Sequence, residues 1–143
     1  MIRPMKMDDV EAIAEIETLS FSVPWSKESI LQELDNKDAY YLVMEENGKV
    51  LGYGGFWKIL DEAHITNLAI TPEFRGRKLG KKLLEAMLNY CRTLEIKKAT
   101  LEVRESNFVA LKVYTSLGFY IEGKRSRYYT NPTEDAMIMW ASL

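Results

Sequence analysis

Two β-rich runs on either side of Asn47-Gly48 constrain the fold of this chain more than any other feature. The stretch "YYLVMEENGKVLGYGGFWKI", residues 40–59, is rich in aromatic and β-branched residues before and after that dipeptide. Asn-Gly is the strongest short-range hairpin signal, because both residues tolerate the positive φ angles of a two-residue turn. The sequence therefore predicts two antiparallel strands joined by a tight turn.

Helical and strand patterns alternate along the rest of the chain. Apolar residues recur at a helical period in four segments, and Pro24 separates the first two of these. The sequence predicts strands at 1–5, 63–72, 98–106, 119–129 and 135–143, and helices at 8–21, 26–34, 80–96 and 107–118. With neither an internal repeat nor a linker, the order β-α-α-β-β-β-α-β-α-β-β predicts a single mixed α/β (α+β) domain over residues 1–143.

Composition limits the classes of protein that the chain can belong to. Its 143 residues suit one domain, and the 47% of hydrophobic residues suit a compact soluble globule. No apolar run is long enough for a membrane span, and the N-terminus lacks the apolar core of a signal peptide. The single cysteine, Cys91, suits a reducing cytoplasm, and the net charge of −2 does not favour nucleic acid. We expect a cytoplasmic monomer that binds no metal, since no Cys/His cluster has ligand spacing.

The stretch "EFRGRKLGKK", residues 73–82, concentrates positive charge where a helix is expected to begin, at about Arg77. Five of the eight residues from Arg75 to Lys82 are cations. A helix N-terminus already carries about half a positive charge, so this arrangement is locally unfavourable unless an anion offsets it. Helix starts bind phosphates through free N–H groups, but a solvated basic face is the alternative. The glycine spacing excludes a P-loop.

Several blocks of the chain resemble the GNAT superfamily of acetyl-CoA-dependent N-acetyltransferases. That family carries R/Q-x-x-G-x-G/A at a helix start, and this chain reads Arg75-Gly76-Arg77-Lys78-Leu79-Gly80, with lysine at the first glycine position. The blocks "SVPWS", "LDEAHITNLAI", "LEVRESN", "VYTSLGF" and "YYTNPTEDAMIM" resemble its RimI branch, the ribosomal-protein-alanine N-acetyltransferases. The resemblance implies the GNAT fold, a mixed and mostly antiparallel sheet with splayed parallel strands and helices on both faces.

The resemblance also implies where acetyl-CoA binds. In the family the cofactor lies between the two splayed strands and contacts backbone groups of one strand and of the following helix start. The implied cofactor-binding residues of this chain are Leu68, Ala69, Ile70, Gly76, Arg77, Lys78, Leu79, Gly80, Lys81 and Asn107. Asn107 also stands at the expected N-terminus of a helix, where it is a good capping residue.

Glu102 and Tyr114 are the candidate catalytic residues. Strand alternation places Glu102 on the face opposite Leu101 and Val103, where it is either a functional carboxylate or a solvated one paired with Arg104. Tyr114 shares a helix face with apolar residues, so a core aromatic is its alternative role. The resemblance implies that Glu102 acts as general base through an ordered water and that Tyr114 protonates the leaving thiolate.

His64 is a further candidate for the base, and the resemblance to the GNAT family implies a substrate. His64 is the only histidine, and we expect it to make a structural hydrogen bond rather than to act as the base. The resemblance implies acetylation of the N-terminal alanine of small-subunit ribosomal protein S-eighteen. Two alternatives stay open: an enzyme that acetylates other N-termini or lysines, and a catalytically silent acetyl-CoA-binding module.

Overall fold

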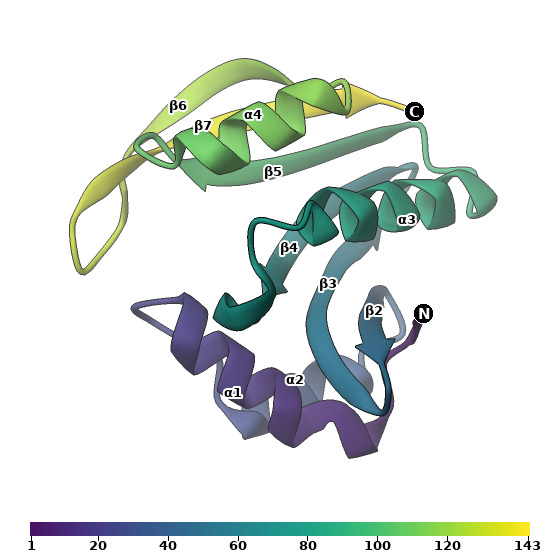
Figure 1. Ribbon diagram of the computed structural model, residues 1–143. Coiled ribbons are helices and arrows are strands. Elements are labelled where there is room, and N and C mark those ends of the chain that lie inside the picture. The colour runs from purple at the N-terminus through teal and green to yellow at the C-terminus, as the bar shows by residue number, and fades with distance from the viewer.

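A single mixed sheet of seven strands forms the centre of the protein, and a computed structural model describes it over residues 1–143 (Figure 1). The strands are β1 (Ile2–Pro4), β2 (Ala39–Glu46), β3 (Lys49–Ile59), β4 (Glu62–Ile70), β5 (Lys98–Arg104), β6 (Tyr120–Tyr129) and β7 (Glu134–Ser142). The helices are α1 (Val10–Ser20), α2 (Lys27–Leu34), α3 (Leu79–Thr93) and α4 (Phe108–Ser116), with short 3₁₀ helices at Met7–Asp9 and Pro72–Phe74. The predicted order of strands and helices is confirmed.

The predicted hairpin is present as β2 and β3. Asn47 and Gly48 have φ angles of 52° and 78°, both positive as a type I′ turn requires. The sheet order is β1-β2-β3-β4-β5-β7-β6, and only β4 and β5 run parallel to each other. The predicted sheet, mixed but mostly antiparallel, is therefore confirmed.

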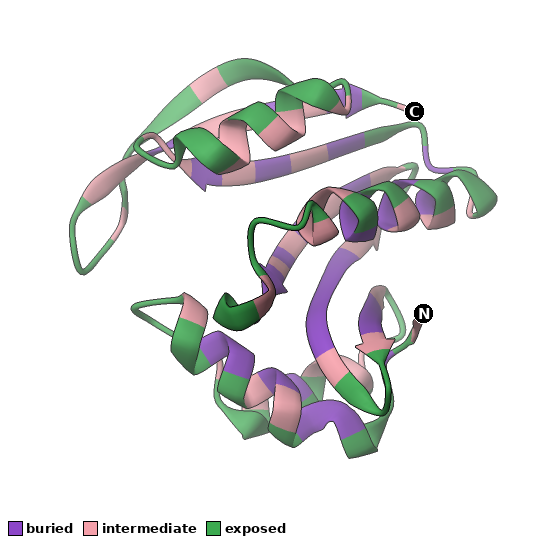
Figure 2. Cartoon of the chain, viewed as in Figure 1, coloured by how far each residue is buried: buried purple, intermediate pink, exposed green.

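Side-chain alternation in β2 divides the apolar residues between the two faces of the sheet. Tyr41 and Val43 pack with α1 and α2, whereas Leu42 and Met44 pack with α3. Figure 1 shows α1 and α2 on one side of β3 and α3 on the other, with α4 over β5 and β7. Buried residues line the surfaces that these helices and strands turn toward each other (Figure 2). Helices cover both faces of the sheet, as predicted.

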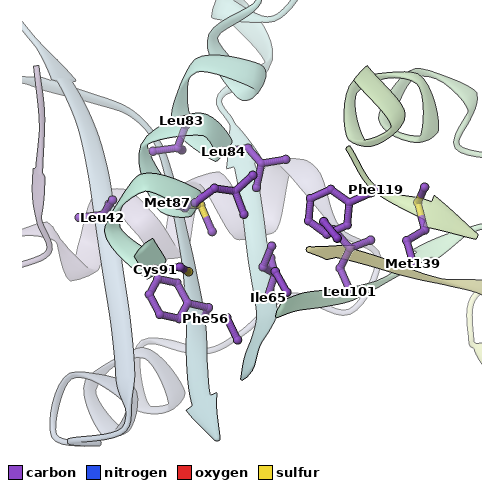
Figure 3. Packing of buried hydrophobic residues seen from close by; sticks show 14 of the residues in the cluster. Leu42, Phe56, Ile65, Leu83, Leu84, Met87, Cys91, Leu101, Phe119 and Met139 are labelled. Carbon is purple, nitrogen blue, oxygen red and sulfur yellow. The ribbon is translucent and has the colours of Figure 1, made fainter. Parts of the chain in front are cut away.

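The larger apolar cluster extends from α3 to both parts of the sheet (Figure 3). Met87 of α3 lies between Phe56 of β3 and Leu101 of β5, and Cys91 is buried in the same cluster. Gly54 allows α3 to approach β3 closely, since a Cβ atom there would lie 2.6 Å from the Met87 sulphur. This helix therefore joins the two parts of the sheet on one face.

The parallel strands β4 and β5 pair only at their beginnings. Glu62–His64 are in register with Lys98–Thr100, and no pairing continues beyond them. We call the separation that follows the splay. The apolar cluster beneath α1 and α2 involves β2, β3 and β4 and no residue of β5, β6 or β7. The side of β5 and its neighbours away from α3 and α4 is therefore free of a covering helix (Figure 1).

Candidate active site

Glu102 lies at the start of the splay, on the face of β5 that no helix covers. Its side chain is 10% exposed, and its Oε2 is 2.9 Å from Nε2 of His64 on β4. Nε of Arg125, on β6, lies 3.7 Å from the other carboxylate oxygen, Oε1. The hydrogen bond from His64 lowers the pKa of Glu102, and the same bond raises the pKa of His64. The carboxylate is therefore ionised at neutral pH, with Oε2 held by His64 and the Arg125 guanidinium nearby.

The alternative pairing of Glu102 with Arg104 is wrong. The Arg104 guanidinium instead donates to the carbonyl oxygens of Thr130 and Pro132, at 2.9 Å each, and lies over the ring of Tyr129. It also reaches Glu134 at 3.3 Å. Arg104 thus holds the β6–β7 turn and does not pair with Glu102, although both side chains project from the same face of β5.

A cavity of about 420 Å³ opens beside Glu102 on this uncovered face. Strands β4, β5, β6 and β7 all contribute to its walls. Its lining residues are Ile59, Glu62, Ala63, His64, Thr100, Glu102, Glu122, Gly123, Arg125, Ile138 and Trp140. A polar group that entered this cavity would meet the Glu102 carboxylate directly.

The backbone of β4 presents free groups to the splay. The N–H of Thr71 donates to the Leu51 carbonyl, which fixes the alternation of hydrogen bonds along the antiparallel β3–β4 pair. By that alternation the N–H groups of Leu68 and Ile70 point away from β3, while the polar groups of Ala69 are directed toward Tyr53. Of the three β4 residues expected to contact acetyl-CoA, only Leu68 and Ile70 have backbone groups directed at the splay.

The loop before α3 turns twice through left-handed conformations. Gly76 has a φ of 81°, and Lys78 has φ 60° and ψ 22°. These angles delay the helix, which begins at Leu79 rather than at about Arg77. Lysine is compatible with right-handed helical angles, but the left-handed region is one that glycine adopts far more readily. The left-handed conformation at residue 78 therefore explains why the family has a glycine at this position.

The start of α3 leaves a run of backbone donors free. None of the N–H groups from Gly76 to Lys81 donates to a backbone or side-chain acceptor of the chain. Two of the neighbouring cations have other contacts: Arg75 donates to the Ile70 carbonyl and to Ser20 Oγ, and Arg77 lies over the ring of Phe74. The region can hold an anion through its backbone, with the exposed lysines around it.

Tyr114 lies on α4 and Asn107 directly precedes that helix, on the opposite side of β5 from Glu102. The Tyr114 ring packs 5.9 Å from that of Phe119, and burial raises the pKa of Tyr114 to about 12. Tyr114 is partly buried against the larger apolar cluster, and its catalytic role stays a prediction. Asn107 caps the helix, since its Oδ1 accepts a hydrogen bond from the Ala110 N–H at 3.1 Å. Because the two candidate catalytic side chains come from opposite faces of β5, a bound group can reach both only through the splay.

Comparisons with known proteins agree with this architecture. The model of the acetyltransferase (GNAT) family matches residues 10–119. The chain belongs to the GNAT family. A Bacillus subtilis (strain 168) protein with the provisional name of [ribosomal protein bS18]-alanine N-acetyltransferase is 42% identical, with 99% of this chain and 95% of that protein covered. The Escherichia coli (strain K12) enzyme of that name is 33% identical over 96% of this chain and 94% of its own.

A solved structure gives the same result for the fold. The crystal structure of the ribosomal-protein-alanine N-acetyltransferase from Escherichia coli superposes with a TM-score of 0.92 at 30% identity. The superposition covers 99% of this chain and 92% of that one. The expected GNAT fold is thereby confirmed. No helix has the length and apolarity to cross a membrane, and no group of His, Cys, Asp and Glu is placed to hold a metal ion.

Sequence reasoning missed the partner of His64 in this GNAT site. His64 does make the expected hydrogen bond, but its partner is the candidate base itself. The signal was available, because His64 and Glu102 both occupy polar positions of alternating strands. Their pairing, however, depends on how β4 and β5 are placed side by side, and the sequence pattern alone did not supply that register.

Proposed function

We propose that this GNAT enzyme transfers the acetyl group of acetyl-CoA to the α-amine of the N-terminal alanine of ribosomal protein bS18. The observation that carries the proposal is the Glu102 carboxylate, ionised and held at the start of the splay. Relatives named for this activity match nearly the whole chain. The proposal thus joins a site able to deprotonate an amine to the activity of similar proteins.

The start of α3 fits the phosphates of acetyl-CoA. Free N–H groups from Gly76 to Lys81 point to no acceptor of the chain, and exposed lysines lie beside them. Gly80 is not required by its own backbone: a Cβ there would meet only Ile70 Cγ1, at an ordinary 3.8 Å. Since the packing of the chain would accept a Cβ atom at Gly80, the glycine is best explained by a ligand that approaches the backbone closely. Asn107, whose side-chain oxygen caps α4, keeps its amide N–H₂ for a second contact.

The reaction requires one proton to leave the amine and one to reach the sulphur. Glu102 accepts the amine proton through water, the nitrogen bonds to the acetyl carbon, and the carbon–sulphur bond breaks. The Leu68 and Ile70 N–H groups, directed at the splay, are placed to stabilise the oxyanion that develops on the acetyl oxygen. Glu102 then releases its proton to water, and the thiolate takes a proton from water as coenzyme A leaves, so the reaction balances.

Tyr114 is the hydrogen-bond donor to the leaving sulphur. With a pKa of about 12 its phenol stays protonated at neutral pH. A thiol has a pKa near ~8.5, so complete transfer of the phenol proton to a free thiolate is uphill. Tyr114 is therefore best suited to stabilise the developing thiolate by a hydrogen bond, with protonation completed as the product leaves.

An α-amine is the easier acceptor for this site. Its pKa of ~7.7 to 8.0 leaves about a tenth or more of it neutral at pH 7, whereas lysine, near ~10.4, is almost entirely charged. A carboxylate whose pKa is lowered is a weak base. Such a base matches an N-terminal amine better than a lysine side chain.

The test is acetyl-CoA turnover with a peptide that begins Ala-Arg, compared with the same peptide carrying a blocked α-amine and a free lysine. Glu102→Gln should lower kcat by about a hundredfold or more while coenzyme A still binds. Glu85→Gln, on the exposed side of α3, is the matched control and should match the native protein. Turnover of lysine alone would favour the lysine acetyltransferase, and binding without turnover would favour the silent module.

A further inference from the structure

The two oxygens of the Glu102 carboxylate have different surroundings. Oε2 is held by His64 at 2.9 Å, a normal charge-assisted hydrogen bond. Oε1 has only Arg125 at 3.7 Å, too long for a hydrogen bond, and the Arg125 side chain is 56% exposed. One oxygen is thus fixed by the chain, whereas the other is open to a group that enters from the cavity.

His64 is itself held in place. It lies at the last paired position of β4, directly before the splay, in register with Thr100. The ring of Trp57 on β3 meets the imidazole edge-on at a centroid distance of 6.4 Å. Trp57 is in turn fixed by a hydrogen bond from its Nε1 to Glu33 of α2, which also accepts from the Tyr41 hydroxyl. The imidazole therefore has a defined orientation rather than a free rotamer.

We propose that His64 is a positioning residue for the base: it donates to Oε2 and so directs Oε1 of Glu102 at the substrate amine. This inference rests on the proposed function, in which Glu102 removes the amine proton. The imidazole acts through the carboxylate, which is the group that takes the proton. Of the two carboxylate oxygens, Oε1 is the one that accepts the proton through water.

The same hydrogen bond makes the base sensitive to pH. The charged groups around His64 are Glu102 on β5, Arg125 and Glu122 on β6, and Glu62 on its own strand, all at the cavity. The bond to Glu102 outweighs burial and Arg125, and it raises the pKa of His64 above its usual 6.5. Below that raised pKa the imidazole is charged, and a full positive charge beside Glu102 weakens it as a base. Activity should therefore decrease as pH is lowered and His64 becomes protonated.

Two substitutions separate the hydrogen bond from the titration. His64→Ala removes both and should lower kcat by about ten- to a hundredfold, with the KM for acetyl-CoA unchanged. His64→Gln can still donate to Oε2 and should keep most of the activity at pH 8. In the native protein, protonation of the substrate amine and of His64 should both lower kcat/KM at acid pH, so a plot of log kcat/KM against pH should have a slope of ~2 there. Because glutamine does not titrate, only protonation of the amine remains in His64→Gln, and the slope should fall toward ~1.

A double substitution and a spectrum complete the test. His64→Ala should cost nothing further in a Glu102→Gln background, since His64 acts only through Glu102. His64 is the only histidine, so its imidazole signals can be followed by NMR, and Glu102→Gln should lower its pKa. Equal losses in the alanine and glutamine variants with the native pH profile would indicate a merely structural role and overturn the proposal. Full activity of Glu102→Gln would refute Glu102 as the base and the proposal with it, whereas absence of α-amine turnover by the native protein would refute the proposed function.

Discussion

Lys78 should lower stability through its backbone while its charge aids cofactor binding, and two substitutions can separate these effects. A non-glycine residue in the left-handed region, here at φ 60°, destabilises the folded chain by about 1–2 kcal/mol. Glycine avoids this strain, but its greater conformational freedom in the unfolded chain offsets about 0.5–1 kcal/mol of the gain. Lys78→Gly should therefore be more stable than Lys78→Ala by about 1 kcal/mol. For a chain of this size that difference corresponds to about 2–4 °C in Tm.

Both substitutions remove the same exposed cation, so their effect on acetyl-CoA should be equal. One unit charge near a phosphate in a high-dielectric setting is worth about 1 kcal/mol, so the Kd should rise about fivefold in each and less at high salt. Thermal unfolding measures the first effect, and titration calorimetry with coenzyme A measures the second. Equal Tm values for the two variants would refute the strain argument, and an unchanged Kd in both would remove Lys78 from the phosphate site.

Three further outcomes are expected. Gly80→Ala should raise Tm slightly, since alanine favours a helix by up to about 1 kcal/mol, yet raise the KM for acetyl-CoA, whereas Asn89→Ala on the exposed side of α3 should raise only Tm. Tyr114→Phe should lower kcat by about a hundredfold in a steady-state assay with coenzyme A affinity retained. Asp9→Asn should destabilise the fold by about 3 kcal/mol in urea titrations, because Arg3 then loses a buried partner. Since that partner lowers the pKa of Asp9, the native contribution is present above about pH 4 and lost as pH falls, so Asp9→Asn should flatten acid unfolding.

Features set by nearby residues could be predicted from the sequence. The Asn47-Gly48 turn, the order of strands and helices and the N-cap at Asn107 depend on local conformational preference or on simple periodicity. The face on which Glu102 lies also follows from alternation within one strand. Each of these predictions needed no knowledge of which strands become neighbours.

Features set by the neighbours of a strand could not be predicted in this way. The His64–Glu102 pair requires the β4–β5 register, and the availability of Leu68 and Ile70 rather than Ala69 requires the β3–β4 hydrogen-bond alternation. The left-handed Lys78 was missed for another reason. Lysine is compatible with helical angles, so its own propensity indicated nothing of the loop path that the surrounding chain imposes.

The limited pairing of β4 with β5 explains how one sheet can be both stable and open. An interruption inside a sheet leaves backbone N–H and C=O groups unpaired, which is costly if they are also buried. Here the apolar cluster beneath α3 joins β3 to β5 on one face, so the sheet holds together although the strands separate. The uncovered face beside Glu102 needs no such cluster, and the free groups of β4 remain available to a ligand. The core that stabilises the fold thus lies beneath α3 on one face of these strands, while the separation between β4 and β5 stays open to the acetyl-CoA that we propose it binds.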